Sequence, residues 1–226
     1  MQSNDNSTAH SATAYDHHVR QSIPNYDSFH DETINLVCTY VPRPGLWVDT
    51  GCGTGTLVFK AHPRFPETEF LLADPSPAML DCAREKLRGK NRVTILPAAG
   101  TRQLDVHGKA DVVTAIQAHH YAGPDERKLA TEACFEILRP DGLFVTFENI
   151  RPLTDVGTRI GKEYWRRYQE KAGKTEEEAR KHVERFGREY HPITVEEHLA
   201  LLRSCGFRAV ELLWYSYLQA GFYCVK

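Results

Sequence analysis

The sequence predicts an α/β protein with a doubly wound, mostly parallel sheet, and three observations lead to this prediction. Short apolar runs alternate with helical patterns between residues 45 and 150. The first two runs each end in an acidic residue, Asp49 and Asp74. A glycine-rich segment follows the first run directly, as it does in open α/β sheets that bind nucleotides at their carboxyl edge.

The composition is typical of one globular domain and excludes several functional classes. The chain has 226 residues, of which 41% are hydrophobic, and this is enough for a buried core. A net charge of −2 and a pI of 6.6 indicate no direct binding of nucleic acid. A mean hydropathy of −0.48, with no apolar run near about 18 residues, indicates no transmembrane helix and no membrane partner. Six scattered cysteines without a CxxC pair favour a reduced, cytoplasmic setting.

The chain begins with a polar segment and two predicted helices. Residues 1–14 offer almost nothing to bury, so we expect a disordered tail followed by a single domain over residues 15–226. Apolar residues recur at helical spacing between residues 15 and 41, and Pro24 divides this stretch into two helices. A proline pair at positions 42 and 44 ends the second helix.

Five strands and three helices follow in alternation. Each predicted strand is a short apolar run bounded by turn residues, and each predicted helix places apolar residues three or four positions apart. The fifth strand comes after an Arg-Pro-Asp-Gly turn at residues 139–142. The predicted strands are 46–49, 70–74, 93–96, 111–116 and 142–147, and the predicted helices begin near 56 or span 77–87 and 126–138.

The pattern changes after the fifth strand. Residues 154–190 are charge-rich and helical, and they are too long for an ordinary connection, so we expect a helical lid over the carboxyl edge of the sheet. Trp165, Tyr168 and Tyr190 in this stretch line an acceptor pocket or, alternatively, form the core of the lid. A capping pattern at Thr194 predicts a helix over 193–205, and strands over 209–217 and 221–225 end the chain.

The glycine loop carries the strongest chemical signal. Gly51, Gly53 and Gly55 are spaced G-x-G-x-G, which permits a tight turn and the close approach of a ligand. The spacing is unlike the G-x-G-x-x-G of nicotinamide-dinucleotide sites, and no Gly-Lys-Ser/Thr sequence marks an NTPase loop. Asp74 closes the next strand about 20 residues later, where an acid can accept hydrogen bonds from both ribose hydroxyls of an adenosine ligand.

These residues resemble the class I S-adenosylmethionine-dependent methyltransferases. The resemblance rests on Val48–Gly55, on the segment Ala73–Leu80 and on the turn before the fifth strand, and it covers roughly residues 45–150. It implies a Rossmann-like class I methyltransferase fold whose mostly parallel sheet ends in an antiparallel strand. It also implies that the helices of residues 15–44 fold over the cofactor, S-adenosyl-L-methionine.

The resemblance also implies roles for individual residues. The glycine loop contacts the methionine part of the cofactor, Asp74 holds the ribose, and Met79 flanks the adenine. Ala99 stands where the family often has an aspartate that reaches the adenine. Arg20 is a candidate for the methionine carboxylate, because a guanidinium matches that group, or alternatively for a surface ion pair. The expected cofactor-binding residues are Tyr15, Arg20, Tyr26, Asp49, Gly51, Cys52, Gly53, Asp74, Pro75, Met79, Ala99, Gly100 and Gln117.

A narrower resemblance extends over most of the chain. Residues 15–26, Thr194–His198 and Leu201–Phe207 are similar to the bacterial carboxy-S-adenosylmethionine synthase group. That group makes a carboxylated cofactor from prephenate for wobble-uridine modification in tRNA. Its glycine loop is usually Gly-Cys-Ser-Leu-Gly, whereas this chain has Gly-Cys-Gly-Thr-Gly, and Arg180 and Arg185 both lie near the register of a carboxylate-binding arginine.

The candidate catalytic residues follow the fourth strand. His119, His120 and Tyr121 come at the carboxyl edge of the sheet, and a histidine can remove the proton of an acceptor. Neighbouring residues of an extended segment point in opposite directions, so we expect one of the two histidines to face the site. We predict no metal, because these histidines and His191 lack i,i+4 spacing and a clear carboxylate partner.

Three functions are compatible with these observations. The first is methyl transfer to a small-molecule acceptor bound under the lid. The second is a reaction like that of the carboxy-S-adenosylmethionine synthases, and the third is a non-catalytic subunit that binds S-adenosylmethionine. Exposed Trp and Tyr side chains in the lid could also serve a homodimer contact.

Overall fold

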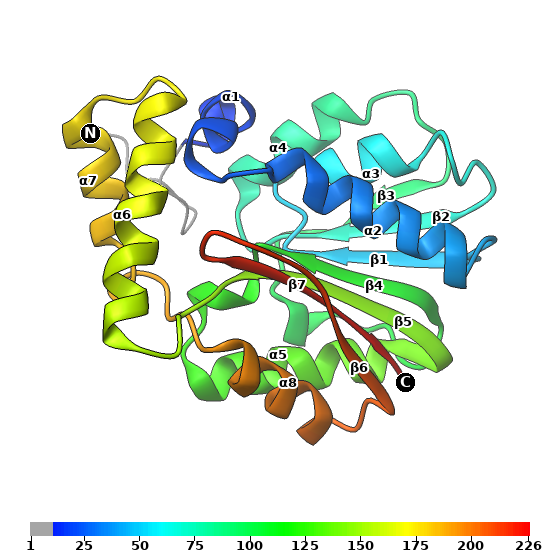
Figure 1. Ribbon diagram of the computed structural model, residues 1–226. Coiled ribbons are helices and arrows are strands. Elements are labelled where there is room, and N and C mark those ends of the chain that lie inside the picture. Colours follow the sequence, from blue (N-terminus) through cyan, green and yellow to red (C-terminus); the bar gives the residue numbers. More distant parts are fainter. Residues whose placement is uncertain (1–10) are drawn as a thin grey trace.

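A seven-stranded sheet is the centre of the computed structural model, which describes residues 11–226 (Figure 1). Its strand order is β3-β2-β1-β4-β5-β7-β6. All neighbours from β3 to β5 run parallel, and β7 runs antiparallel to both β5 and β6. The predicted class I fold, with its antiparallel terminal strand, is confirmed. The strands are β1 (Leu46–Thr50), β2 (Glu69–Ala73), β3 (Val93–Ile95), β4 (Ala110–Ile116), β5 (Leu138–Asn149), β6 (Ala209–Ser216) and β7 (Gln219–Val225).

Helices cover both faces of the sheet, because each face is lined by large apolar side chains. Three helices, α2 (Tyr26–Tyr40), α3 (Thr56–Ala61) and α4 (Pro77–Lys86), lie on one face, where Trp47 and Phe147 are fully buried. Two helices, α5 (Pro124–Ile137) and α8 (Val195–Ser204), cover the other face around Phe144 and Phe222. This arrangement leaves the carboxyl edge of the parallel strands free for a site.

Three further helices stand at that carboxyl edge (Figure 1). They are α1 (Ala12–Ser22), α6 (Asp155–Lys171) and α7 (Glu176–Glu184). The segment that contains α6 and α7 has a small core of its own, in which Trp165 and Tyr190 are buried. The Nε1 of Trp165 donates to the carbonyl oxygen of Ser22 at 2.7 Å, which joins α6 to the end of α1.

The element boundaries differ from the predicted ones at a few places. Helix α1 begins at Ala12, so the last residues of the predicted disordered tail are helical, while residues 1–10 lie outside the described part of the chain. Strand β5 begins four residues early, because Leu138 already pairs with Ala110 before a register shift. The predicted capping of α8 is present, with the Thr194 side chain accepting from the backbone N–H of Glu197.

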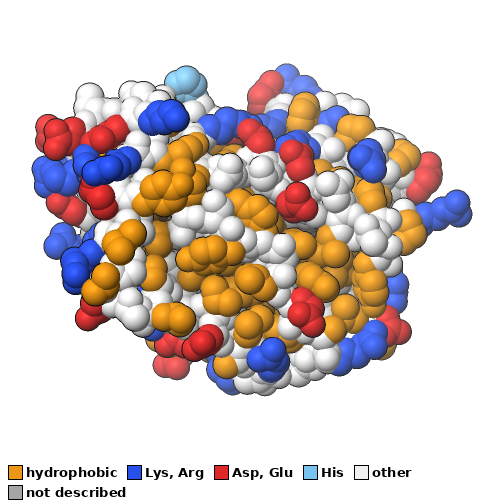
Figure 2. All heavy atoms as spheres, in the orientation of Figure 1, with side chains coloured by type: hydrophobic (Ala, Val, Ile, Leu, Met, Phe, Trp, Pro, Cys, Tyr) orange, Lys and Arg blue, Asp and Glu red, His pale blue; other side chains and the backbone are white. Residues whose placement is uncertain are grey.

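Apolar side chains also gather on the face seen in Figure 2, over α6 and the β6–β7 hairpin. Leu153, Val156, Ile160 and Tyr164 follow one another at helical spacing and are all exposed. The ring of Tyr164 stacks on that of Tyr217 in the hairpin turn, which ties α6 to the end of the sheet. None of the helices in the described part of the chain is long and apolar enough to span a membrane.

Candidate active site

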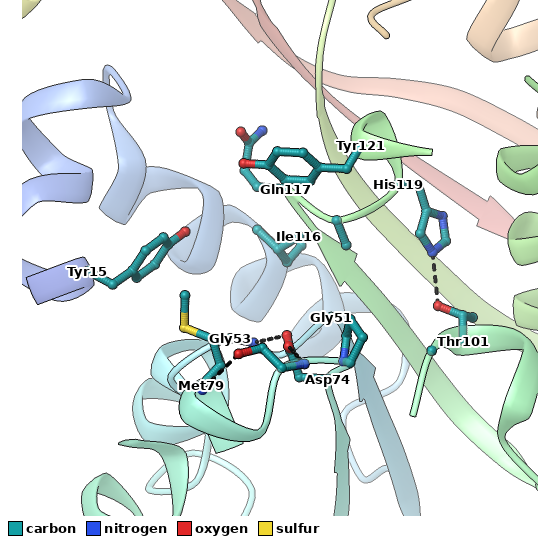
Figure 3. Close-up of a pocket in the computed structure, with 14 residues that line it drawn as sticks. Tyr15, Gly51, Gly53, Asp74, Met79, Thr101, Ile116, Gln117, His119 and Tyr121 are labelled. Atoms are coloured by element: carbon teal, nitrogen blue, oxygen red, sulfur yellow. Dashed lines mark hydrogen bonds between the residues drawn. The ribbon is translucent and has the colours of Figure 1, made fainter. Parts of the chain in front are cut away.

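A pocket of about 260 Å³ lies at the carboxyl edge, between the loops that follow β1, β2 and β4 (Figure 3). Most of the residues predicted to bind the cofactor or act in catalysis line this pocket. They are Tyr15, Gly51, Gly53, Asp74, Pro75, Met79, Gly100, Gln117, His119 and Tyr121. Four residues that we did not predict also line it, namely Ser76, Thr101, Ile116 and Ala118.

Glycine is required in the loop after β1 because this loop packs directly against the loop after β4. Gly51 has a φ of +65°, and a Cβ atom there would lie 2.5 Å from the Cβ of Ala118. Gly55 has a φ of +74°, and its Cβ would meet Leu87 at 2.9 Å. Side chains at either position would therefore force the loop away from its neighbours.

Asp74 joins the floor of the pocket to the next loop. Its Oδ2 accepts from the backbone N–H of Gly53 at 2.9 Å, and its Oδ1 accepts from that of Ser76 at 2.8 Å. Ser76 caps α4 by accepting from the backbone N–H of Met79. Asp74 is 8% exposed and lies on the pocket wall, where its carboxylate can accept from a ligand (Figure 3).

Asp49 lies behind the glycine loop, in a smaller cavity of about 30 Å³ that shares Tyr15 and Gly51 with the main pocket. Burial raises the pKa of Asp49 to about 7, a hydrogen bond from Thr114 opposes this rise, and the negative charge of Asp74 adds to it. A cationic ligand group beside this carboxyl would stabilise its ionised form and lower its pKa.

A buried carboxylate shapes the turn that follows β4. His119–Tyr121 form a 3-10 turn in which Glu148 accepts from the backbone N–H groups of both His119 and His120. Burial on its own would raise the pKa of Glu148, but the hydrogen bond from His120 and nearby positive charge lower it to about 2. The Nδ1 of His120 lies 2.9 Å from this ionised carboxylate and therefore carries the proton and donates it.

The two histidines consequently have different environments. His119 lines the pocket, and its Nε2 lies 3.2 Å from the hydroxyl of Thr101. Burial lowers the pKa of His119, so its imidazole is neutral at pH 7. His120, which we also predicted as a catalytic residue, is 1% exposed, pairs with Glu148 and does not line the pocket. One histidine does face the pocket, although a 3-10 turn rather than an extended segment separates the two.

Helix α1 is held over the site by a polar cluster that we name the α1 latch. It consists of Asp16, Thr54, Thr56 and Lys86. The Nζ of Lys86 lies 2.6 Å from Asp16 and also donates to both threonine hydroxyls. This cluster joins α1 to α4 and to the glycine loop, and the neighbouring residue Tyr15 points into the pocket (Figure 3).

Besides Asp49, four predicted cofactor residues do not line the main pocket. Arg20 forms a bidentate pair with Asp27 on α2, which is the alternative role that the sequence left open. Tyr26 and Cys52 line the small cavity behind the glycine loop, and burial raises the pKa of the Cys52 thiol, so it remains protonated. Ala99 is partly buried and packs against the core instead of lining the pocket, and its backbone N–H donates to the carbonyl oxygen of Asp74.

An inner cavity of about 30 Å³ opens beside the main pocket, under α6 and α7. Tyr15, Gln117 and Tyr121 line both spaces, and the lid contributes Trp165, Tyr190, His182 and Arg185. Tyr168 does not line this cavity, and its hydroxyl donates to the carbonyl oxygen of Arg20 at 2.8 Å. Between residues 11 and 226, no group of three or more His, Cys, Asp or Glu side chains could hold a metal ion.

Comparisons with known sequences agree with this geometry. Residues 48–144 match a family model described as a methyltransferase domain. The carboxy-S-adenosyl-L-methionine synthase of Helicobacter hepaticus is 26% identical over 213 residues, covering 90% of this chain and 87% of that protein. Residues 48–144 are therefore similar to a methyltransferase domain, and the resemblance predicted from the glycine loop and Asp74 is confirmed.

Solved structures show the same fold. The 1,6-didemethyltoxoflavin-N1-methyltransferase of Burkholderia thailandensis, determined with S-adenosylhomocysteine, matches 95% of this chain and 84% of its own with a TM-score of 0.62 at 17% identity. Human N-acetylserotonin methyltransferase in complex with SAM matches 95% of this chain and 58% of its own with a TM-score of 0.60 at 14% identity. Both likenesses confirm the class I methyltransferase fold.

The raised pKa of Asp49 predicts a pH-dependent effect on stability. The same carboxyl ionises near ~4 in the unfolded chain, so the folded state loses stability as the pH rises from about 4 to about 7. We expect Asp49→Asn to raise the free energy of unfolding by on the order of 2 kcal/mol at pH 8 and by clearly less at pH 5. Urea unfolding at both pH values measures the difference.

Asp111→Asn is the matched control, because Asp111 accepts from two backbone N–H groups and from Arg139. These bonds outweigh its burial and lower its pKa, so this variant should lose stability at pH 8. A loss of stability in Asp49→Asn at pH 8 would contradict the raised pKa of Asp49.

The α1 latch predicts that Asp16 limits the opening of α1. Partial burial would raise the pKa of Asp16, but the bonds from Lys86 and the two threonines hold it below the ordinary value of 3.8, so the latch is intact above about pH 4. We expect Asp16→Asn to speed amide hydrogen exchange in α1 several-fold at pH 7. Asp27→Asn, which breaks the exposed pair with Arg20, should change it much less. Equal rates of amide hydrogen exchange in α1 of the two variants would show that the α1 latch does not hold this helix.

Proposed function

We propose that this chain, which has a methyltransferase domain and the class I fold of S-adenosylmethionine-dependent methyltransferases, transfers a methyl group to a small-molecule acceptor held under α6 and α7. The observation that carries the proposal is the pocket in which the glycine loop, Asp74 and Met79 lie together (Figure 3). The inner cavity of about 30 Å³ lies beside it under α6 and α7, so an acceptor would enter the pocket from this side.

The residues present fit S-adenosylmethionine. Asp74 offers carboxylate lone pairs for two ribose hydroxyls, and Met79 with Gly100 gives an apolar and backbone surface for the adenine. Gly51 and Gly53 leave room for the methionine part to approach the backbone. Asp49 provides a buried carboxyl, reached from the small cavity, that a cationic amino group would favour.

The protein positions the acceptor. When bound, S-adenosylmethionine supplies a methyl group on a positively charged sulfur. Asp74 and the glycine loop would hold the cofactor so that this methyl group could pass to a lone pair of the acceptor, with the carbon–sulfur electron pair staying on sulfur and the acceptor's proton leaving to solvent. Tyr15 and Tyr121 flank the place of transfer, and burial raises the pKa of both phenols, so they remain neutral hydrogen-bonding groups. Alignment of the two reactants is the main contribution of the protein.

Native mass spectrometry of the purified protein tests the cofactor assignment. We expect it to retain S-adenosylmethionine or S-adenosylhomocysteine, or to bind S-adenosylhomocysteine in calorimetric titration. Asp74→Ala should weaken this binding at least 100-fold, because it removes the ribose acceptor and frees the Gly53 N–H. Asp81→Ala on the exposed side of α4 is the control. No binding by the unmodified protein would overturn the proposal.

A second candidate is a reaction like that of the carboxy-S-adenosylmethionine synthases. The observation that favours it is Arg185, which lines the inner cavity, whereas Arg180 is exposed and pairs with Glu184. The guanidinium of Arg185 also lies over the ring of Tyr190 and bonds to Glu189. An arginine at this place would suit a carboxylate beside the transferred carbon.

The mass of the retained ligand separates the two candidates. A species heavier than S-adenosylmethionine by one carboxylate favours the second candidate, and Arg185→Met should then lower its occupancy at least tenfold. Arg180→Met is the matched control on the same lid and should retain the ligand. Retention of unmodified S-adenosylmethionine by both variants favours methyl transfer.

A further inference from the structure

Helix α6 presents a row of apolar side chains to solvent. Val156, Ile160 and Tyr164 are four residues apart, so they lie along one face of the helix, and Leu153 precedes them just before its N-terminus. These four residues are 54–66% exposed. Trp165 is buried on a different face of α6, against the lid core, so it cannot serve the homodimer contact expected of exposed aromatic residues in the lid. A solvated helix face is ordinarily polar, so the exposed row requires an explanation.

Strand β6 continues this row at the edge of the sheet (Figure 2). Leu212 and Tyr215 on β6 are about half exposed, and the hairpin turn reaches α6, where Tyr217 stacks on Tyr164. β6 is the last strand in the sheet order, so one side of its backbone has no strand partner within residues 11–226. Edge strands are often protected by lysine or proline, and β6 contains neither. We call the exposed residues of both elements the apolar face: Leu153, Val156, Ile160, Tyr164, Leu212 and Tyr215.

The apolar face is large enough to form the centre of a stable interface. Its side chains present on the order of 500 Å² of surface, near the upper limit of what a monomeric protein exposes in one apolar patch. A specific interface buries roughly 800 Å² of each partner, so the apolar face alone would supply more than half of that area. The polar side chains around it would form the rim that such interfaces have.

The charges beside the apolar face indicate that the partner is a second copy of this chain. A surface that meets itself brings each of its charges near the other copy's charges, so charges of opposite sign must stand at matched places. Arg159 and Glu163 flank the apolar row on the same side of α6 and are four residues apart. Around a twofold axis beside Gly161, two antiparallel α6 helices place Arg159 of each copy next to Glu163 of the other.

Both charged groups are available for this contact. Arg159 forms no ion pair with any other of residues 11–226, and it is exposed. Glu163 accepts three hydrogen bonds, from Arg166 and Arg167 of its own helix, whereas a carboxylate can accept about four. An arginine from a second copy therefore completes the set of donors around Glu163.

We propose that a second copy of this chain covers the apolar face, so that the protein is a homodimer whose two α6 helices lie antiparallel across a twofold axis near Gly161. The same residues of both copies meet in this contact, and their apolar surface leaves water. Because α6 is part of the lid over the inner cavity, each copy holds the lid of the other in place. The proposal depends neither on the acceptor nor on the reaction proposed above.

Sedimentation equilibrium at micromolar concentrations tests the proposal. We expect the unmodified protein to have twice the mass of the 25.7 kDa chain. Ile160→Glu should raise the dissociation constant of the dimer at least 100-fold, because it buries an unpaired charge from each copy beside the axis. Phe59→Glu is the matched control, since Phe59 is an exposed helical residue on α3, outside the apolar face, and its dissociation constant should stay within threefold.

Two further substitutions make the test independent of the folding of one variant. Leu212→Lys places a lysine on the edge strand and should weaken the dimer at least tenfold. Circular dichroism checks the fold of each variant, and if Ile160→Glu loses helix, Leu212→Lys decides. Arg159→Glu should weaken the dimer more than Arg159→Gln does, because it adds repulsion from Glu163 of the other copy.

Three results would overturn the inference. The first is a monomer at all these concentrations, and the second is a dimer whose dissociation constant is unchanged in folded Ile160→Glu and Leu212→Lys, because such a dimer uses another surface. The third is an equal loss in Arg159→Glu and Arg159→Gln, which would reject the antiparallel arrangement of the α6 helices.

Discussion

The close approach of the loops after β1 and β4 is the constraint on which the site depends. These strands are neighbours in the sheet, so their loops leave it side by side, and a Cβ at Gly51 would lie 2.5 Å from the Cβ of Ala118. The close approach of the two loops brings the Gly53–Asp74 bond on one side of the pocket opposite Gln117 on the other. A side chain at position 51 would move both walls, and the pocket would lose its shape.

Most of the fold could be predicted from the sequence because the signals are local. Alternating apolar periods, the glycine loop and the capping pair of α8 each depend on residues a few positions apart. The start of β5 could not be predicted in this way, since Leu138 is placed by its pairing with Ala110 in another strand. The length of residues 154–190 indicated a lid, but only the structure shows that it encloses a core of its own.

The prediction of the site was less complete, because several side chains are placed by partners far along the chain. The 3-10 turn that separates His119 from His120 is shaped by the buried carboxylate of Glu148, and no local pattern indicates this. Arg20 matched a ligand carboxylate by its chemistry, but Asp27, seven residues later, takes its guanidinium. The sequence located the glycines that the loop after β1 requires. It did not show which side chains are occupied by partners far along the chain.

The lid has a property that follows from how it joins the sheet. Ile150 and Ile193 form a parallel bridge, and the N–H of Arg151 bonds to the carbonyl oxygen of Ile193. The intervening segment thus leaves the domain and returns at one point, so that its length and sequence can vary without strain on the strands. Its remaining contacts with the domain are local, such as Trp165 on the end of α1 and Tyr164 on the β6–β7 turn, and a replaced segment would have to keep or rebuild them. Related domains could acquire new substrates by replacing this segment alone, while the cofactor half of the protein stays unchanged.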